Sequence, residues 1–208
     1  MLTTTKPERY SGLRKVDSDS FAGTNADLNG VRGWSSLTGA AVIGEGAGVA
    51  YSQSGGSAVA VYSDTTGSYN KNRYVRCTVN PLAEDTAAGV VLTVGATNEK
   101  YHFLVYVVRT ATNDVLYYSE QFGGAGPIGV LIENLTGFSA RTLLVKRSGR
   151  KIVVECTGAT RYTRTLGGVI DQTDNDPAGL YYFGPAGDPG AVNQAEWDDF
   201  LVRCYPYE

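Results

Sequence analysis

The sequence has few of the residues from which most catalytic and metal centres are built. Its 208 residues include one histidine and three cysteines. The cysteines, Cys77, Cys156 and Cys204, lie far apart and form no Cys-x-x-Cys pair. This pattern argues against a disulfide framework and against a Cys/His zinc site. We therefore predict that the three thiols are buried within strands.

Charge is also scarce, and neither sign dominates. Charged residues make up 19% of the chain, and the formal net charge is −3. Binding to phosphates needs clustered lysine and arginine, so we expect no nucleic-acid partner. A hydrophobic content of 42% is typical of a globular protein and not of a disordered one.

Long apolar runs are missing as well. None approaches the roughly 18 residues that a membrane span requires, so we expect no membrane insertion. Residues 1–16 contain no apolar segment of signal-peptide length. We therefore expect a protein that works inside a cell, or one that leaves it without a signal peptide. Assembly into a virus particle in the host cytoplasm, followed by lysis, is one such route.

Residues 1–16 differ in composition from the rest of the chain. They contain four basic residues and a single acid, Glu8, and Pro7 and Gly12 interrupt any regular element. We predict an extended N-terminal arm, which is either a frayed terminus or a tether to a partner. No internal repeat or linker interrupts the residues that follow, and we therefore predict a single domain over residues 17–208.

Glycine and tyrosine are abundant, with 26 and 14 residues. Short runs rich in valine, isoleucine, tyrosine and threonine recur along the chain, separated by Gly, Asn, Asp and Pro. These runs are residues 32–37, 48–53, 57–63, 72–79, 89–97, 100–110, 114–122, 128–135, 141–149, 151–158, 160–166, 178–184 and 196–203. Their spacing predicts an all-β sandwich or barrel. Only PLAEDTAAG, residues 81–89, predicts a helical turn.

Alternation within the runs indicates which strands are central. In KIVVECT, residues 151–157, one face is apolar and the other is mixed, which predicts a half-exposed strand. In YHFLVYVV, residues 101–108, both faces are apolar, which predicts a strand in the middle of a sheet. The segment LLVKRSGRKIVVE predicts a hairpin that turns at Ser148, Gly149 and Arg150.

Both ends of the chain resemble a known pattern. DSDSF (17–21) and GWSSL (33–37) stand near the start, and DPAGLYYFG (176–184) and WDDFLVR (197–203) stand near the end. Together they resemble the concanavalin A-like lectin/glucanase jelly rolls. More narrowly, they resemble the laminin-G-like domains found in bacterial surface proteins and phage tail proteins. The resemblance covers most of residues 17–204.

The resemblance implies a two-sheet antiparallel jelly-roll sandwich of about six or seven strands per sheet, with the first and last strands side by side. Strict alternation in the last strand would then direct Phe200 and Val202 into the core, while Trp197 and Leu201 cover the second face. Of the two aspartates between them, Asp199 is the better candidate for reaching across to the first strand.

A catalytic motif is only partly present. Glucanases of this superfamily carry Glu-x-Asp-x-x-Glu, in which the two glutamates act as nucleophile and proton donor about 5 Å apart. Glu196 and Asp198 match its first two positions, but Leu201 stands at the third and cannot donate a proton. We therefore predict no catalytic residues. The alternative is a glycoside hydrolase whose carboxylates come from separate strands, for example Glu120, Glu133 or Glu155.

Two groups of acidic residues are candidates for calcium. The segment DQTDNDP offers Asp171, Asp174 and Asp176, although the spacing of an EF-hand is absent and a solvated acidic turn is the alternative. The second group, Asp17 or Asp19 beside Asp199, follows from the resemblance, because many relatives hold a structural calcium ion between their end strands.

Aromatic and polar residues on two adjacent runs suggest a sugar-binding face, since sugars pack on aromatic rings while polar groups bind their hydroxyls. The alternative is that these tyrosines belong to the core. The candidates are His102, Tyr106, Arg109, Tyr117, Tyr118 and Glu120. We therefore expect a non-enzymatic virion module, from a phage tail or capsid, that binds host-surface glycan or contacts other virion subunits. A homo-oligomer is compatible with this role.

Overall fold

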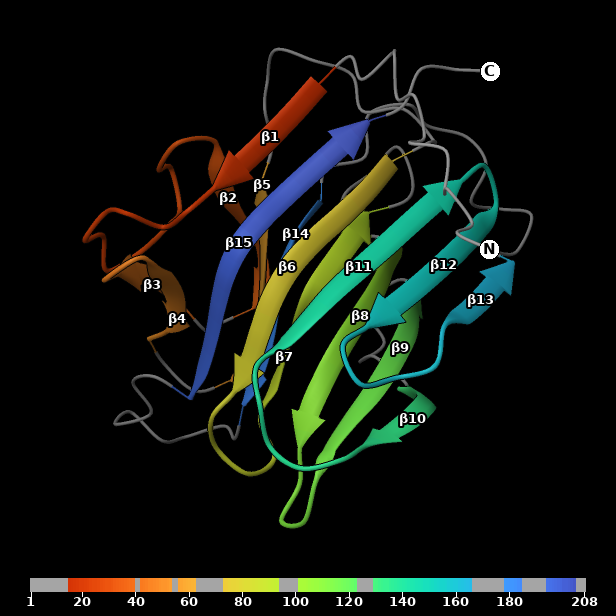
Figure 1. The fold of residues 1–208 in the computed structure, drawn as a ribbon. Helices are drawn as coiled ribbons and strands as arrows, with labels where there is room; N and C mark the ends of the chain where they lie inside the picture. Colours follow the sequence, from red (N-terminus) through yellow and green to blue (C-terminus); the bar gives the residue numbers. More distant parts are fainter. Residues whose placement is uncertain are drawn as a thin grey trace, which may run out of the picture.

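The computed structural model describes residues 15–39, 42–53, 56–62, 73–93, 101–122, 129–165, 178–184 and 194–204. The regular structure of these residues is all β-strand, in two antiparallel sheets that pack face to face (Figure 1). The predicted all-β sandwich is therefore confirmed. The helical turn predicted within residues 81–89 is wrong, because this segment ends one strand, turns, and begins the next. None of the described residues forms a helix that could span a membrane.

We call the first layer sheet A. Its strands are β1 (Lys15–Asp19), β3 (Ile43–Gly46), β4 (Val49–Ser52), β6 (Arg73–Pro81), β11 (Arg141–Ser148), β12 (Lys151–Cys156), β13 (Tyr162–Thr165) and β15 (Ala195–Cys204). Their order is β13-β12-β11-β6-β15-β4-β3, and β1 also pairs with β15. The predicted hairpin is the β11–β12 pair, in which Ser148 lies opposite Lys151.

The second layer is sheet B. Its strands are β2 (Trp34–Gly39), β5 (Gly56–Tyr62), β7 (Ala87–Thr93), β8 (Tyr101–Arg109), β9 (Asp114–Phe122), β10 (Val130–Leu135) and β14 (Ala178–Gly184), in the order β10-β9-β8-β7-β14-β5-β2. Strand β8 lies between β7 and β9, as its two apolar faces predict. Phe103 and Val105 belong to the core between the sheets, whereas Leu104 and Tyr106 form a second cluster on the outer face of sheet B.

The core between the sheets is built from large aromatic side chains. Its largest fully buried members include Trp34, Trp197, Tyr182, Phe103 and Phe200. The rings of Trp34 and Phe200 lie 5.0 Å apart, which joins sheet B to sheet A near the ends of the chain. Such pairs contribute about 1 kcal/mol beyond the area that they bury.

Two of the three cysteines behave as predicted. Cys77 and Cys156 are buried free thiols on β6 and β12. Burial raises the pKa of Cys156 to about 12 and also raises the pKa of Cys77, so both thiols stay protonated and unreactive. Cys204 lies at the end of β15, and its side chain lies outside the described part of the structure.

The first and last strands lie side by side, as predicted. β1 and β15 pair antiparallel from Lys15 opposite Cys204 to Asp19 opposite Phe200, and Figure 1 shows them adjacent at one edge of sheet A. Phe200 and Val202 are each 1% exposed and lie in the core. Residues 1–14 of the predicted arm lie outside the described residues.

The predicted position of Trp197 is wrong, because β15 contains a β-bulge. The pairing of β15 with β6 shifts between Asp198 and Leu201, and Asp199 has a positive φ of 53°. An extra residue in a strand reverses the alternation of faces beyond it. Trp197 and Phe200 are three positions apart, yet both point into the core.

Candidate functional site

The bulge lies where the neighbour of β15 changes. Along one edge, β15 pairs with β6 for its whole length. Along the other edge, Glu196 and Trp197 pair with β4, and the residues from Phe200 onward pair with β1. Two short strands therefore meet the same edge one after the other (Figure 1). Asp198 and Asp199 lie at the break between them.

A hollow of about 680 Å³ opens at this break. Its polar lining comes from the end of β1, the loop before β2, the outer side of β6 and the bulge itself. The residues that matter most are Ser18, Asp19, Arg32, Arg76, Asp199 and Leu201. We call it the end-strand hollow. Its size lies within the range of small-molecule sites.

Arg32 joins two buried carboxylates at the wall of the end-strand hollow. Asp19 is 8% exposed and Glu45 is fully buried. The Arg32 guanidinium donates to Asp19 Oδ2 at 3.1 Å and to Glu45 Oε1 at 2.9 Å, and its Nη2 also donates to Glu45 Oε2. The hydrogen bond from Arg32 lowers the pKa of Glu45, and the same bond raises the pKa of Arg32. Arg32 and Glu45 are therefore both charged at neutral pH.

The carboxylate of Asp19 is engaged in several hydrogen bonds and an ion pair. It already accepts hydrogen bonds from the Phe21 N–H at 2.8 Å, from Trp34 Nε1 at 2.7 Å and from Arg32. The positive group beside Asp19 is the Arg32 guanidinium, and Asp199 belongs to the lining of the same hollow. A calcium ion at Asp19 and Asp199 stays a prediction. Among the residues that the structure describes, no group of three or more His, Cys, Asp or Glu side chains could hold a metal ion.

The other calcium candidates cannot be placed. Asp171, Asp174 and Asp176 lie outside the described residues, and so does the side chain of Asp17, although Asp17 itself is in β1 opposite Val202. A calcium site that uses these residues stays a prediction.

A second candidate region crosses the outer face of sheet B. In sheet B, Tyr181 of β14 lies opposite Gly89 of β7, and Gly89 lies opposite Tyr106 of β8. Tyr106 in turn lies opposite Tyr117 of β9, which lies opposite Leu131 of β10. These five residues form one line across five neighbouring strands, which we call the aromatic row. Phe183, two residues beyond Tyr181 on β14, is 47% exposed, and Leu131 is 52% exposed.

Gly89 allows the tyrosines of the row to meet. A Cβ atom at this position would lie 2.5 Å from Tyr106 Cβ and would clash with the Val105 carbonyl oxygen. Without a side chain between them, the rings of Tyr106 and Tyr181 approach to 5.2 Å, and those of Tyr106 and Tyr117 stack at 5.7 Å. Burial raises the pKa of Tyr106 to about 12, so its hydroxyl remains a neutral hydrogen-bonding group.

Only part of the predicted glycan-binding set belongs to this row. Tyr106 and Tyr117 lie on the outer face of sheet B, but Tyr118 points into the core and stacks on Phe103 and Tyr162. Neighbouring residues of a strand face opposite sides, so Tyr117 and Tyr118 cannot serve one face. For His102 the structure describes the backbone alone, opposite Thr93 and Gln121.

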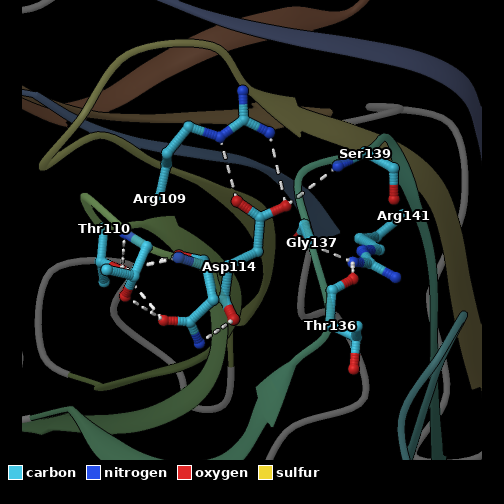
Figure 2. Close-up of polar contacts among 9 residues, drawn as sticks. Arg109, Thr110, Asp114, Thr136, Gly137, Ser139 and Arg141 are labelled. Carbon is cyan, nitrogen blue, oxygen red and sulfur yellow. Dashed lines mark hydrogen bonds and ion pairs between the residues drawn. The ribbon is translucent and has the colours of Figure 1, made fainter.

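The two charged residues of that set are engaged in ion pairs. Glu120 accepts a hydrogen bond from Arg164 Nε at 2.8 Å, which connects sheet B to β13 of sheet A. Arg109 holds the fully buried Asp114 through Nε at 3.0 Å and Nη2 at 3.3 Å, and Asp114 also accepts from the Ser139 N–H (Figure 2). Arg109 therefore stabilises the end of the sandwich, where Arg141 donates to the carbonyls of Thr136 and Gly137.

The carboxylates considered for hydrolysis are each engaged elsewhere. Besides Glu120, Glu133 accepts from the Thr160 N–H at 2.7 Å, and Glu155 pairs with Lys146 at 3.3 Å and with Arg161 at 3.5 Å. Each of these three glutamates therefore makes a structural contact with a different neighbour.

Arg32, Glu45 and Tyr181 are the important residues that the sequence did not single out. The position of Tyr181 could have been predicted, because alternation in AGLYYFG places Tyr181 and Phe183 on one face of the strand and Leu180 and Tyr182 on the other. The contact between Arg32 and Glu45 could not have been predicted, because it joins a loop to a strand across 13 residues without any regular spacing.

Comparison with known proteins agrees with the fold. No family model matches the chain, and no curated protein matches it in sequence. Among solved structures, the CBM2 module of the evolved Dit of Lactobacillus casei BL23 phage J-1 is 12% identical, with 93% of this chain and 99% of that chain covered and a TM-score of 0.57.

Two further structures are similar to the same extent. The catalytic domain of an endo-1,3-beta-glucanase (laminarinase) from Thermotoga petrophila RKU-1 is 10% identical, with coverage of 92% and 97% and a TM-score of 0.56. A protein described with the endo-acting O-glycanases by which human gut microbiota initiate mucin breakdown is 12% identical, with coverage of 94% and 100% and a TM-score of 0.61. The chain therefore has a concanavalin A-like jelly-roll fold.

Proposed function

We propose that the protein is a non-enzymatic glycan-binding module of a virion, in a phage tail or associated with a capsid. The observation that carries this proposal is the aromatic row, with the exposed Phe183 beside it on the same face of sheet B. Its polar groups are the hydroxyls of the tyrosines, and its rings lie on a rigid sheet.

The chemistry of this face suits a sugar ring. The apolar side of a pyranose packs against an aromatic ring, while hydroxyl groups exchange hydrogen bonds with nearby polar atoms. Tyr117 is half-buried and Phe183 is 47% exposed, so both present ring surface at the outside. Tyr106 and Tyr181 support them from below, since they are only 7% and 4% exposed.

A glycan array, followed by calorimetry with the best ligand, tests the proposal. We expect Tyr117→Ala and Phe183→Ala each to weaken binding about tenfold, which corresponds to the ~1.4 kcal/mol of one aromatic contact. Phe138→Ala is the matched control, because Phe138 is 51% exposed but lies in the loop after β10 against Arg109. An array without a binder, or equal effects of all three variants, would refute glycan binding by this face.

The virion role and a laminin-G-like kinship are supported by the end-strand motifs and by the shared fold of the phage J-1 module, which is itself described as a carbohydrate-binding module. Purified virions probed with an antibody against this protein would test the assignment. Labelled tail or capsid is the expected result. Release of reducing sugar from a bound polysaccharide would instead favour the hydrolase alternative.

A further inference from the structure

We propose that the end-strand hollow is a second ligand site, separate from the aromatic row, and that it binds one neutral, hydroxyl-rich sugar unit. The inference takes from the proposed function only the class of ligand. It rests on a different set of residues, on sheet A and the loop before β2.

The lining offers hydrogen-bond donors and acceptors side by side. Ser18 and Ser20 bring hydroxyls, Asp199 brings an exposed carboxylate, and Arg76 brings a guanidinium that has no ion-pair partner among the described residues. The bonds from Arg32 to Asp19 and Glu45 leave one N–H of its Nη1 unused among the same residues. Vicinal hydroxyls of a sugar both donate and accept, and therefore match such a mixed lining.

The backbone at the break between β4 and β1 leaves the hollow open to a ligand. Asp199 has no register partner in β1, β4 or β6, and its N–H donates at 2.7 Å to Asp198 Oδ1. The positive φ of Asp199 turns its side chain out of the regular alternation of β15, next to the end of β1. The hollow is thus held by two strand ends and a bulge, which is rigid structure and not a loop alone.

The charges of the described residues around the hollow disfavour an anionic ligand. Asp19, Asp199 and the Glu45 behind them carry three negative charges, whereas Arg32 and Arg76 carry two positive charges. A phosphate or a sialic acid would meet a net negative wall, and Arg32 is already neutralised by its two partners. A neutral sugar meets no such repulsion.

Each candidate site has its own tryptophan reporter. The chain contains two tryptophans. Trp34 Nε1 donates to Asp19, which lines the end-strand hollow, and Trp197 Nε1 donates at 3.0 Å to the carbonyl of Gly89, a member of the aromatic row. Both rings are buried, so a ligand changes their indole N–H signals indirectly, through neighbouring residues such as these partners.

The experiment is a titration of the ¹⁵N-labelled full chain with methyl glycosides of glucose, galactose, mannose and N-acetylglucosamine into the millimolar range, read at the two indole signals. We expect at least one glycoside to move the Trp34 signal in a saturable way. In Asp199→Asn and Arg76→Gln, that shift should fall at least threefold at the same sugar concentration. Glu84→Gln and Lys151→Gln, which change exposed charges elsewhere, should leave it unchanged.

The outcomes separate the two proposals. If only the Trp197 signal responds, the hollow does not bind sugar, while binding at the aromatic row is supported. If only the Trp34 signal responds, the hollow is supported and the aromatic row is not. A larger Trp34 shift with inorganic phosphate than with any glycoside, or a shift that survives both variants, overturns the assignment of a neutral sugar to the hollow.

Discussion

At the scale of single residues, Arg32 determines the electrostatics of the region where the ends of the chain meet. It forms ion pairs with both Asp19 and Glu45, which are nearly or fully inaccessible to solvent. Asp19 and Glu45 share this one cation, so removal of Arg32 would leave two buried carboxylates unpaired. Gly89 is a second single residue with a large effect. Because it has no side chain, Tyr106 and Tyr181 can contact each other.

The change Glu45→Gln should lower the free energy of unfolding at pH 7 by about 2 kcal/mol, since the charge-assisted hydrogen bonds between Glu45 and Arg32 are lost. The pKa of Glu45 is lowered in the folded protein, so the stability that this pair adds is present above the usual value of 4.5 and is lost as pH falls through the folded-state pKa. Urea unfolding at several pH values measures it.

The difference between Glu45→Gln and the native protein should therefore shrink below about pH 4.5 and vanish in stronger acid. Glu84→Gln, in an exposed turn, is the control and should have no such dependence. A destabilisation by Glu45→Gln that stays constant with pH would show that the charge of Glu45 is unimportant.

The change Gly89→Ala should destabilise the protein by about 3 kcal/mol, because the new methyl group overpacks against the β8 backbone and Tyr106. It should also alter the near-ultraviolet circular dichroism of the tyrosines. Gly46→Ala is the matched control, since a Cβ there would meet Tyr51 at an ordinary 3.4 Å. Equal effects of the two changes would contradict the role assigned to Gly89.

At the scale of elements, the bulge in β15 decides which side chains enter the core. It lets Trp197 pack against Tyr182 and Phe200 pack against Trp34, although three positions separate the two residues of β15. It also sets Asp199 at the break between β4 and β1. One local irregularity therefore completes the core and creates the end-strand hollow.

Deletion of Asp199 should remove the bulge and turn either Trp197 or Phe200 away from the core, at a cost above about 4 kcal/mol. Asp199→Gly should keep the bulge and stay within about 1 kcal/mol of the native stability, because glycine adopts a positive φ without strain. Urea unfolding followed by tryptophan emission compares them. A deletion variant as stable as Asp199→Gly would contradict the role of the bulge.

At the scale of the whole molecule, β1 closes the sandwich by bringing the start of the chain to its end. It covers the edge of β15 from Phe200 onward and supplies Asp19 to Trp34 and Arg32. The two sheets are thus connected near both termini by one strand of five residues.

Removal of residues 1–19 should destabilise the protein by more than about 3 kcal/mol, since β15 loses a ladder partner and Arg32 and Trp34 lose Asp19. Removal of residues 1–14 is the control, because it leaves β1 intact. Hydrogen exchange of the β15 amides should accelerate in the first truncation alone. Similar exchange in both would contradict closure by β1.

The predictions from sequence were correct where the structure depends on residues that are close together in the chain. Alternation within 101–108 correctly separated Phe103 and Val105 from Leu104 and Tyr106, and turn residues placed the β11–β12 hairpin. The same alternation, applied to 114–122, would have separated Tyr117 from Tyr118. Strict alternation then failed at Trp197, because a bulge leaves no mark in a sequence that reads as a continuous strand.

The sequence by itself thus determined the all-β class and most strand positions, and its resemblance to the concanavalin A-like jelly rolls implied the meeting of the two end strands. Only the tertiary structure decided that Tyr181, Gly89 and Tyr106 form one line, that Arg32 reaches Glu45, and that a hollow opens beside Asp199. The physical reason is distance along the chain. Each of these features depends on strand register and on contacts between remote segments, which are selected by the packing of the whole core and not by the residues that neighbour them in sequence.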